Sequence, residues 1–315
     1  MTKASDARTA TGKNMKKVAI ITRTKNRNIM LSRAMSSVAG QTFRDFTWVV
    51  VNDGGDRAGV ERVLARWSDS SVPVVPVHHP VNKGMEAASN AGIAACASDY
   101  VVVHDDDDTW DPAFLAKTIE FLESPSGRPY AAVLTGTVRI DEVMEGETIR
   151  QTFKGIWKPD TVGYPVGCVQ FSDMVVENQF APIALVFRRS AYDEIGGYDE
   201  SLPVLGDWEF NLRLLSHGDI AVIPEALANY HHRPSVKGSN YGNSVHAGVN
   251  RHVIYDAVVR NRIIRKAIED GNPALATLVT TGRHRLVMSN GTPVRLFRRC
   301  KKILRRLAYS SGLAR

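Results

Sequence analysis

Four consecutive aspartates, Asp105–Asp108, follow directly after an apolar segment in the stretch VVVHDDDDTWDP, residues 101–112. Two like charges about 4 Å apart repel by about 1 kcal/mol in water, and by more near a protein surface. The run is therefore unfavourable unless positive charge compensates for it. Carboxylate oxygens are the hard ligands that magnesium, manganese and calcium prefer. The run predicts a divalent-cation site, and a polar loop that caps the next helix is the alternative.

Three more polar clusters follow apolar segments earlier in the chain, at 22–27, 52–55 and 82–84. They combine basic, acidic, amide and glycine residues, and the aspartate run is the fourth cluster of this kind. No P-loop is present, and no GxGxxG motif follows the first apolar segment. A Rossmann dinucleotide site is therefore not expected.

The elements that position these clusters alternate in type. Apolar segments typical of strands alternate with segments of helical spacing; the strands are expected at 16–24, 46–53, 72–79 and 99–106, and the helices at 30–41, 59–67 and 85–97. This alternation predicts βαβ units and a mostly parallel sheet covered on both faces. Because ligands bind at the carboxyl ends of such strands, all four clusters are expected at one edge.

The second half of the chain is less regular. A strand is expected at 130–140, a loop-rich insertion at 141–180, a helix at 206–218 and a further strand from residue 220. The composition, 43% hydrophobic and 23% charged residues, is typical of a soluble globular protein. The sequence contains neither a secretory signal nor an apolar run of about 18 residues. The three cysteines form no metal-ligand pattern and favour a reducing compartment, so a cytoplasmic location is expected.

Seven segments, in their order and spacing, resemble the bacterial family 2 glycosyltransferases with the GT-A fold. The segments are VAIITRTKNR, WVVVNDGGD, NKGMEAASNAGI, VVVHDDDDTWDP, FRRSAYDEIGGYDE, GDWEFNLRLLSHG and NYHHRP. The resemblance covers residues 18–234. It implies an α/β fold in which a mostly parallel sheet is flanked by helices. The expected division is a disordered tail (1–15), a nucleotide-binding half (16–125), an acceptor half (126–235) and a basic helical extension (236–315).

The resemblance also implies a reaction. Such enzymes transfer a sugar from a nucleotide diphosphate donor to a glycan or lipid-linked acceptor, usually with inversion and with Mn²⁺ or Mg²⁺. Many take part in the synthesis of bacterial surface polysaccharide. The positions that match the donor-nucleotide pocket are Thr22, Arg27, Asp53, Lys83, Asp105 and Asp106. Among them, Asp53 matches the acid that contacts the base or the ribose.

Further positions match the metal and the donor sugar. Asp107 is expected to contact the metal directly, and Asp105 is expected to hold the ribose or a metal-bound water. His231 and His232 lie where some relatives bring a histidine to the metal. Asp108 matches a frequent extra acid close to the donor sugar.

Asp207 matches the catalytic base, a carboxylate that takes the proton of the acceptor hydroxyl. The chain departs from the family at two positions: Gly206 stands where a Glu is usual, and Ser89 stands where many relatives carry Arg. Trp208 and Glu209 are weaker candidates for sugar contacts. Glu209 lies two residues beyond Asp207 and so faces away from it on a helix, which favours a structural role.

The C-terminal segment carries seven basic residues between 295 and 306, interleaved with Leu296, Phe297, Ile303 and Leu304. A basic amphipathic helix is typical of binding to an anionic membrane surface, here the inner face of the cell membrane. A helix packed on the domain or a homo-oligomer contact is the alternative. No nucleic-acid motif accompanies the charge.

Two other functions fit parts of the sequence. A nucleotidyltransferase would share the sheet and the metal site, but the glycine-rich basic first loop expected of it is absent. A non-catalytic sugar-nucleotide-binding or scaffold protein would explain Gly206 and Ser89. The retained acids argue against that alternative: they are Asp53, Asp105, Asp107 and Asp207.

Overall fold

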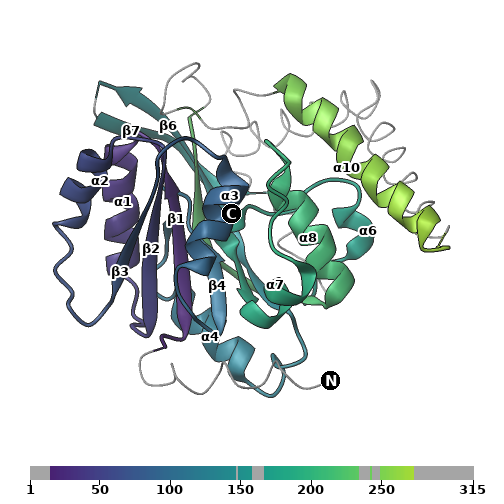
Figure 1. Ribbon diagram of the computed structural model, residues 1–315. Coiled ribbons are helices and arrows are strands. Elements are labelled where there is room, and N and C mark those ends of the chain that lie inside the picture. Colours follow the sequence, from purple (N-terminus) through teal and green to yellow (C-terminus); the bar gives the residue numbers. More distant parts are fainter. Residues whose placement is uncertain (1–14, 147, 158–166, 234–241, 243–248, 273–315) are drawn as a thin grey trace, which may run out of the picture. The chain divides into compact units, whose positions relative to one another are not determined.

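The computed structural model describes residues 15–146, 148–157, 167–233, 242 and 249–272. The strands are β1 (Val18–Thr24), β2 (Phe46–Asp53), β3 (Val74–His79), β4 (Tyr100–Val103), β5 (Thr109–Trp110), β6 (Ala132–Glu145), β7 (Thr148–Ile156), β8 (Leu185–Arg188) and β9 (Ile220–His232). The helices are α1 (Asn28–Ala39), α2 (Arg57–Leu64), α3 (Met85–Ala94), α4 (Phe114–Glu123), α6 (Phe171–Met174), η1 (Pro182–Ala184), α7 (Arg189–Ile195), α8 (Gly206–His217) and α10 (Val249–Glu269). Figure 1 shows their arrangement.

The strands form one sheet in the order β3-β2-β1-β4-β8-β6-β9-β5, with β7 paired to β6. Its first four strands are parallel, as the alternation of apolar and helical segments predicts. Val18 lies opposite Phe46 on β2 and opposite Tyr100 on β4, so the carboxyl ends of these strands meet at one edge. The predicted α/β fold is confirmed.

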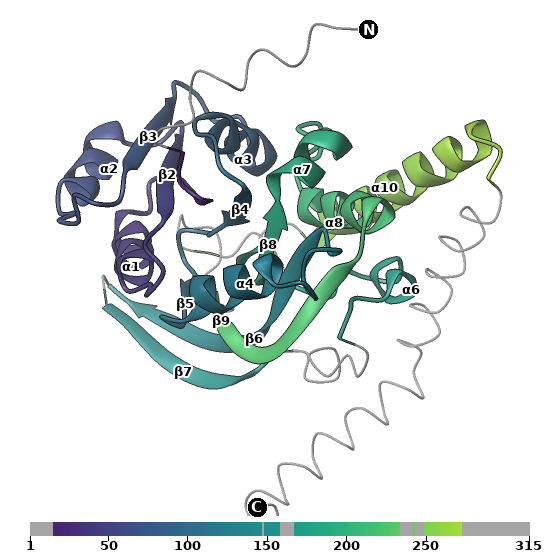
Figure 2. The same ribbon diagram turned by 90° about the horizontal axis from the view of Figure 1, so that it is seen from below.

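Helices cover both faces of this parallel half. Figure 2 shows α1 on one face of the sheet and α3 on the other. The small residues of α3 allow it to approach the sheet closely. A Cβ atom added at Gly92 would lie 2.5 Å from a methyl carbon of Ile21 and 2.9 Å from a methyl carbon of Val51. The close packing fixes the position of the loop at 82–84, which leads into α3.

The second half joins the same sheet through antiparallel pairs. β8 runs antiparallel to both β4 and β6, whereas β9 runs parallel to β6. The loop-rich insertion predicted from residue 141 is wrong over its first part, because β6 continues to Glu145 and β7 pairs with it. Most β7 side chains are exposed, so the strand lacks the apolar alternation by which a half-buried strand is recognised.

The chain divides into two compact units, one of residues 1–169 and 179–256 and the other of residues 170–178 and 257–315. In the second unit, Arg260 is buried and donates hydrogen bonds to the carbonyl oxygens of Val175 and Val176, at 2.6 and 2.9 Å. Within the residues that the structure describes, no helix is long and apolar enough to cross a membrane. The basic segment 295–315 lies outside the described residues.

Candidate active site

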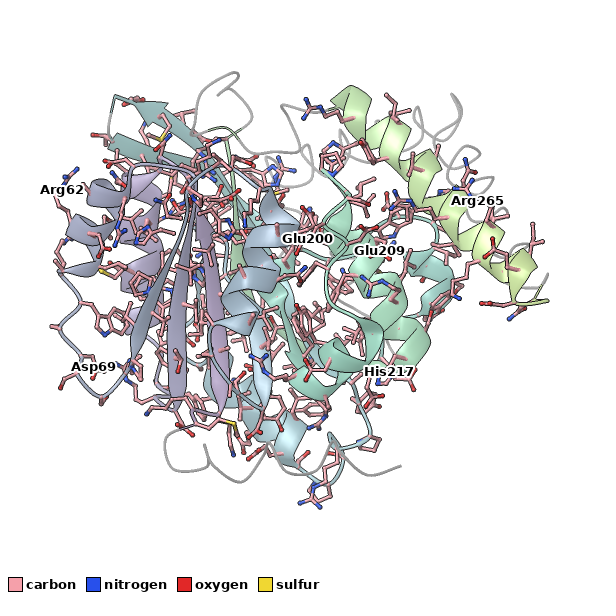
Figure 3. All side chains as sticks on the ribbon, viewed as in Figure 1. Arg62, Asp69, Glu200, Glu209, His217 and Arg265 are labelled. Atoms are coloured by element: carbon pink, nitrogen blue, oxygen red, sulfur yellow. The ribbon has the colours of Figure 1, made fainter. Side chains whose placement is uncertain are left out.

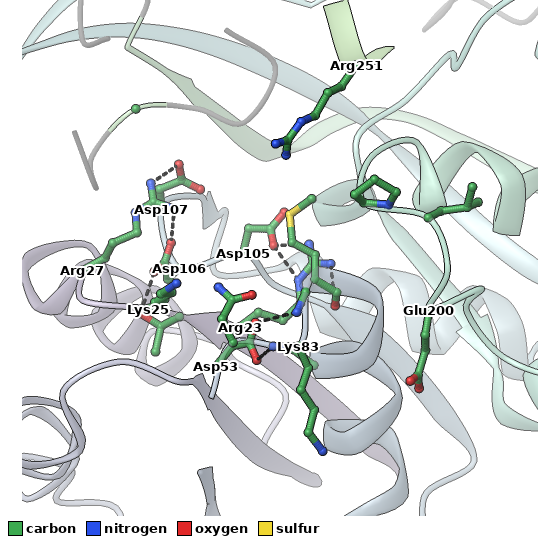
Figure 4. A pocket seen from close by; sticks show the side chains of 18 of the residues that line it. Arg23, Lys25, Arg27, Asp53, Lys83, Asp105, Asp106, Asp107, Glu200 and Arg251 are labelled. Carbon is green, nitrogen blue, oxygen red and sulfur yellow. Dashed lines mark hydrogen bonds and ion pairs between the residues drawn. The ribbon is translucent and has the colours of Figure 1, made fainter. Parts of the chain in front are cut away.

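A cavity of about 740 Å³ opens at the carboxyl ends of β1, β2 and β4 (Figure 4). This volume lies in the range of small-molecule sites. Six of the predicted site residues line it: Arg27, Asp53, Lys83, Asp105, Asp106 and Asp107. The loop 200–203 and two residues of α10, Arg251 and Tyr255, line it as well.

Asp53 ends β2, and three groups fix its carboxylate. The backbone amides of Lys83 and Gly84 donate to it at 2.8 and 2.9 Å, and the His79 ring lies 2.8 Å away. The carboxylate therefore ties the loop before α3 to the end of β2. Its fixed orientation at the cavity wall suits a group that binds a nucleoside.

Arginine side chains compensate the first two aspartates of the run. Arg23 at the end of β1 donates through Nε to Asp105 at 3.0 Å and through a terminal nitrogen to Ser89 at 3.2 Å. Arg27 lies 2.8 Å from Asp106, which also accepts a hydrogen bond from the Thr24 hydroxyl at 2.7 Å. Burial, only partly offset by Arg27, raises the pKa of Asp106 to about 7.

Asp107 has the opposite environment. Its carboxylate is paired with Arg27 at 2.7 Å and with the fully buried Arg233, and its carbonyl oxygen accepts a hydrogen bond from Arg33. Burial alone would raise its pKa, but Arg27 and Arg233 outweigh burial and hold the pKa of Asp107 well below its usual value. Asp107 is therefore ionised throughout the physiological pH range.

Asp108 and His231 face the protein interior. Asp108 is buried and accepts a hydrogen bond from the His231 amide at 2.8 Å, and burial followed by the charge of Asp107 raises its pKa well above the usual value. The His231 ring lies 2.6 Å from Glu142 and 2.9 Å from the Thr109 hydroxyl. Both ring nitrogens of His231 are thus engaged by protein groups.

Glu142 on β6 is the centre of a charged cluster that the sequence did not reveal. Besides His231, it accepts hydrogen bonds from Arg33 at 2.6 Å and from Arg233 at 3.1 Å. The same two arginines hold Asp107. Arg233 lies in NYHHRP, one of the segments that resemble the family. Nothing in the sequence pointed to Arg33 on α1 or Glu142 within β6, because more than 100 residues separate the two.

The aspartate run is thus compensated by arginines of the protein. Within the part of the chain that the structure describes, no group of three or more His, Cys, Asp or Glu side chains is arranged to hold a metal ion. Mg²⁺ is commonly held by only one or two carboxylates, together with water and substrate phosphates. Asp105 and Asp107 supply hard oxygen atoms at the cavity wall, so the residues present fit a cation completed by a diphosphate.

Other predicted residues lie apart from the cavity wall. Thr22 is fully buried and its hydroxyl accepts a hydrogen bond from the Trp48 indole at 2.9 Å. Trp208 is also buried. Glu209, labelled on α8 in Figure 3, pairs with Arg213 at 2.6 Å. Arg213 in turn donates to two carbonyl oxygens near the end of α7, so Glu209 has a structural contact.

Asp207 lies in the first turn of α8, where the helix dipole favours an acid. It is half-buried and follows the cavity-lining loop 200–203 in the chain, but it does not itself line the cavity. Leu205, which precedes the helix, has a φ of 65°, a left-handed conformation that a side chain of this type rarely adopts. His232 packs edge-on against Tyr230, with 4.3 Å between the ring centroids. Tyr230 lines the cavity, and His232, two residues further along β9, lies on the same face of the strand.

Comparison with known proteins finds similarity to one family of glycosyltransferases. Residues 19–171 match the model described as glycosyl transferase family 2. The uncharacterized glycosyltransferase YwdF of Bacillus subtilis is 26% identical over 220 residues, covering 68% of this chain and 74% of the relative.

Two solved structures share the fold. S. aureus TarS 1–349 in complex with UDP-GlcNAc has a TM-score of 0.63 and 16% identity, covering 87% of this chain and 74% of TarS. The mannosyltransferase PcManGT of Pyrobaculum calidifontis, in complex with GDP-Man and Mn²⁺, has a TM-score of 0.58 and 15% identity, covering 92% and 80%. The match over residues 19–171 and the glycosyltransferase relatives show that the chain is similar to the family 2 glycosyltransferases, and the two solved structures show that it shares their fold.

Proposed function

We propose that the chain transfers a sugar from a nucleotide diphosphate donor, bound in the cavity at the ends of β1, β2 and β4, to a hydroxyl group of a glycan or lipid-linked acceptor. The observation that supports this most is the cavity wall, where Asp53, Asp105 and Asp107 lie beside several basic side chains. Solved relatives with this fold bind UDP-GlcNAc and GDP-Man, which makes a sugar nucleotide the natural donor class. Surface polysaccharide synthesis is the proposed setting.

The donor's diphosphate is proposed to bind the basic side chains of the cavity that are not paired with an aspartate. Arg23 and Arg27 are paired with the aspartate run, whereas Lys25, Lys83 and Arg251 form no ion pair among the described residues. Figure 4 shows Arg251 reaching from α10 toward the cavity. Asp53, at the far wall, would contact the ribose or the base.

A divalent cation, Mn²⁺ or Mg²⁺, is proposed to bind between Asp105, Asp107 and the diphosphate, with His232 as a further ligand. Bound there, it would neutralise the negative charge that develops on the departing phosphate. Arg27 and Arg233 keep Asp107 ionised, which is the state that a cation requires.

Asp207 is proposed as the general base. It would accept the acceptor's proton as the hydroxyl oxygen attacks the sugar carbon, while the bond to the diphosphate breaks on the opposite side. A single displacement of this kind inverts the configuration at the sugar carbon. No covalent intermediate with the protein is needed.

Thermal denaturation with a panel of nucleotides tests the donor site. We expect UDP or GDP, with manganese, to raise the unfolding free energy by about 2.7 kcal/mol at one hundred times the dissociation constant. The corresponding nucleosides and monophosphates should stabilise less, because they lack the diphosphate that Lys25, Lys83 and Arg251 would meet. Equal stabilisation by uridine and UDP, or by guanosine and GDP, would contradict the proposed diphosphate contacts.

The segment 295–315 is proposed to hold the enzyme at the inner face of the cell membrane, near its acceptor. Basic and apolar residues alternate there, so insertion and charge attraction would act together. We expect the full chain, but not a chain ending at Gly291, to sediment with anionic vesicles at low salt. The binding should weaken as salt screens the charges. If the full chain stays in the supernatant, a packing or oligomer contact is the better account of this segment.

A further inference from the structure

Glu86 is a buried carboxyl group to which the functional account above assigns no role. It lies in the first turn of α3, only 4% exposed, and its side chain runs toward the start of α8. A Cβ atom added at Gly206 would lie 2.6 Å from the Glu86 carboxyl carbon and closer still to one of its oxygens. The Glu86 carboxyl therefore fills the space that a side chain at Gly206 would enter.

The backbone does not require glycine at position 206. Gly206 is the first residue of α8 and lies outside the left-handed region that favours glycine. An acid at this end of a helix would be stabilised by the helix dipole. The obstacle to a side chain at Gly206 is thus Glu86 itself, which reaches the same place from another element.

The charges around Glu86 link it to the active site. Arg23 from β1, Asp207 from α8 and Asp105 after β4 act on it electrostatically. Burial raises the pKa of Glu86 to about 7, Arg23 opposes this rise, and Asp207 and Asp105 add to it. Arg23 also donates hydrogen bonds to the carboxylate of Asp105 and to the hydroxyl group of Ser89.

We propose that Glu86 positions Asp207 for its role as base, and that it supplies from α3 the carboxyl group that Gly206 lacks. Gly206 and Ser89 are the two positions at which the chain carries a small residue where the family pattern has a charged one. Glu86 lies beside Gly206, and Arg23 lies beside Ser89. The inference rests on the proposed role of Asp207, and Glu86 acts through Asp207 as a positioning residue.

Exchanging the two positions tests this proposal. The variants are Glu86→Gly, Gly206→Glu and the two combined, and the assay is release of UDP or GDP from UDP-GlcNAc or GDP-mannose, whichever donor the wild type turns over faster. Each single variant is expected to lower kcat by up to about a hundredfold, the scale of a misplaced catalytic group, with KM for the donor nearly unchanged. Gly206→Glu should also lower Tm, because Glu86 stands in its way.

The combined variant is expected to recover kcat to near the wild-type value, because the carboxyl returns to the same place from α8. Glu86→Gln keeps the size of the side chain and should keep Tm while lowering kcat, and it replaces Glu86→Gly if that variant does not fold. Glu120→Gln, an exposed acid on α4, is the matched control and should behave as wild type.

The results separate this proposal from the proposed base. If the combined variant is no more active than Glu86→Gly while Asp207→Asn is inactive, the positioning role of Glu86 is overturned and the base stands. If Glu86→Gln turns over at the wild-type rate, the charge of Glu86 has no role and the proposal fails. An active Asp207→Asn would remove the base on which the inference rests.

Discussion

Asp207→Asn is expected to bind UDP or GDP as tightly as the wild type and to transfer sugar about 10²–10⁴-fold more slowly, because a general base acts only as the acceptor's proton is removed. The substitution keeps the size of the side chain at the start of α8 and removes its basicity. Calorimetry measures the nucleotide affinity, and release of the nucleoside diphosphate measures turnover.

Asp193→Asn is the matched control, since Asp193 is an exposed acid on the neighbouring α7. It should leave both quantities unchanged. Turnover by Asp207→Asn close to the wild-type rate would mean that another group takes the proton, and loss of nucleotide binding would mean that Asp207 serves the donor site instead.

Asp107→Ala is expected to lower the free energy of unfolding by about 3–5 kcal/mol, with or without metal. Arg233 is fully buried and pairs with Asp107 and Glu142. Without Asp107, its guanidinium keeps the ion pair with Glu142, a carboxylate that it shares with Arg33. Urea denaturation near pH 7 measures the loss.

The neighbouring Asp106 provides a control, because its ionisation is expected to lower the free energy of unfolding, whereas that of Asp107 raises it. The pKa of Asp106 is raised to about 7 in the folded protein from a usual 3.8, so the ionised form costs stability as the pH rises between these values. The free energy of unfolding of Asp106→Asn, measured relative to that of the wild type, should therefore be higher at pH 8 than at pH 4. The pKa of Asp107 is lowered, so its contribution is present above about pH 4 and is lost only in strong acid. A similar loss in both variants would show that the charges do not determine stability here.

The parallel half of the fold was predictable because its signals are local. Each of β1, β2 and β4 is an apolar run that ends in polar residues, and the rule for parallel sheets places those ends together. The edge that holds Asp53 and Asp105 followed from these facts alone. By contrast, β7 is exposed along most of its length, so its sequence carries no sign of the sheet face that it joins.

The compensation of the aspartate run was only half predictable. Repulsion within the run required positive charge, but the sequence could not distinguish a cation from arginines. Arg33 and Arg233 reach Asp107 from segments 74 and 126 residues away, and such distances leave no pattern in the chain. The contact between Glu86 and Gly206 is hidden for the same reason, since it joins the starts of two helices that are distant in sequence.

The location of the bound donor tests the central claim most directly. Hydrogen–deuterium exchange would be compared for the free protein and for the protein with UDP or GDP and manganese. The account predicts slower exchange in the segments 52–55, 82–89 and 104–108, which surround the cavity at the strand ends. A second cavity, lined by residues between Glu61 and Pro76, serves as an internal reference and should not change. Protection confined to that reference segment, or none at any nucleotide concentration, would contradict the account.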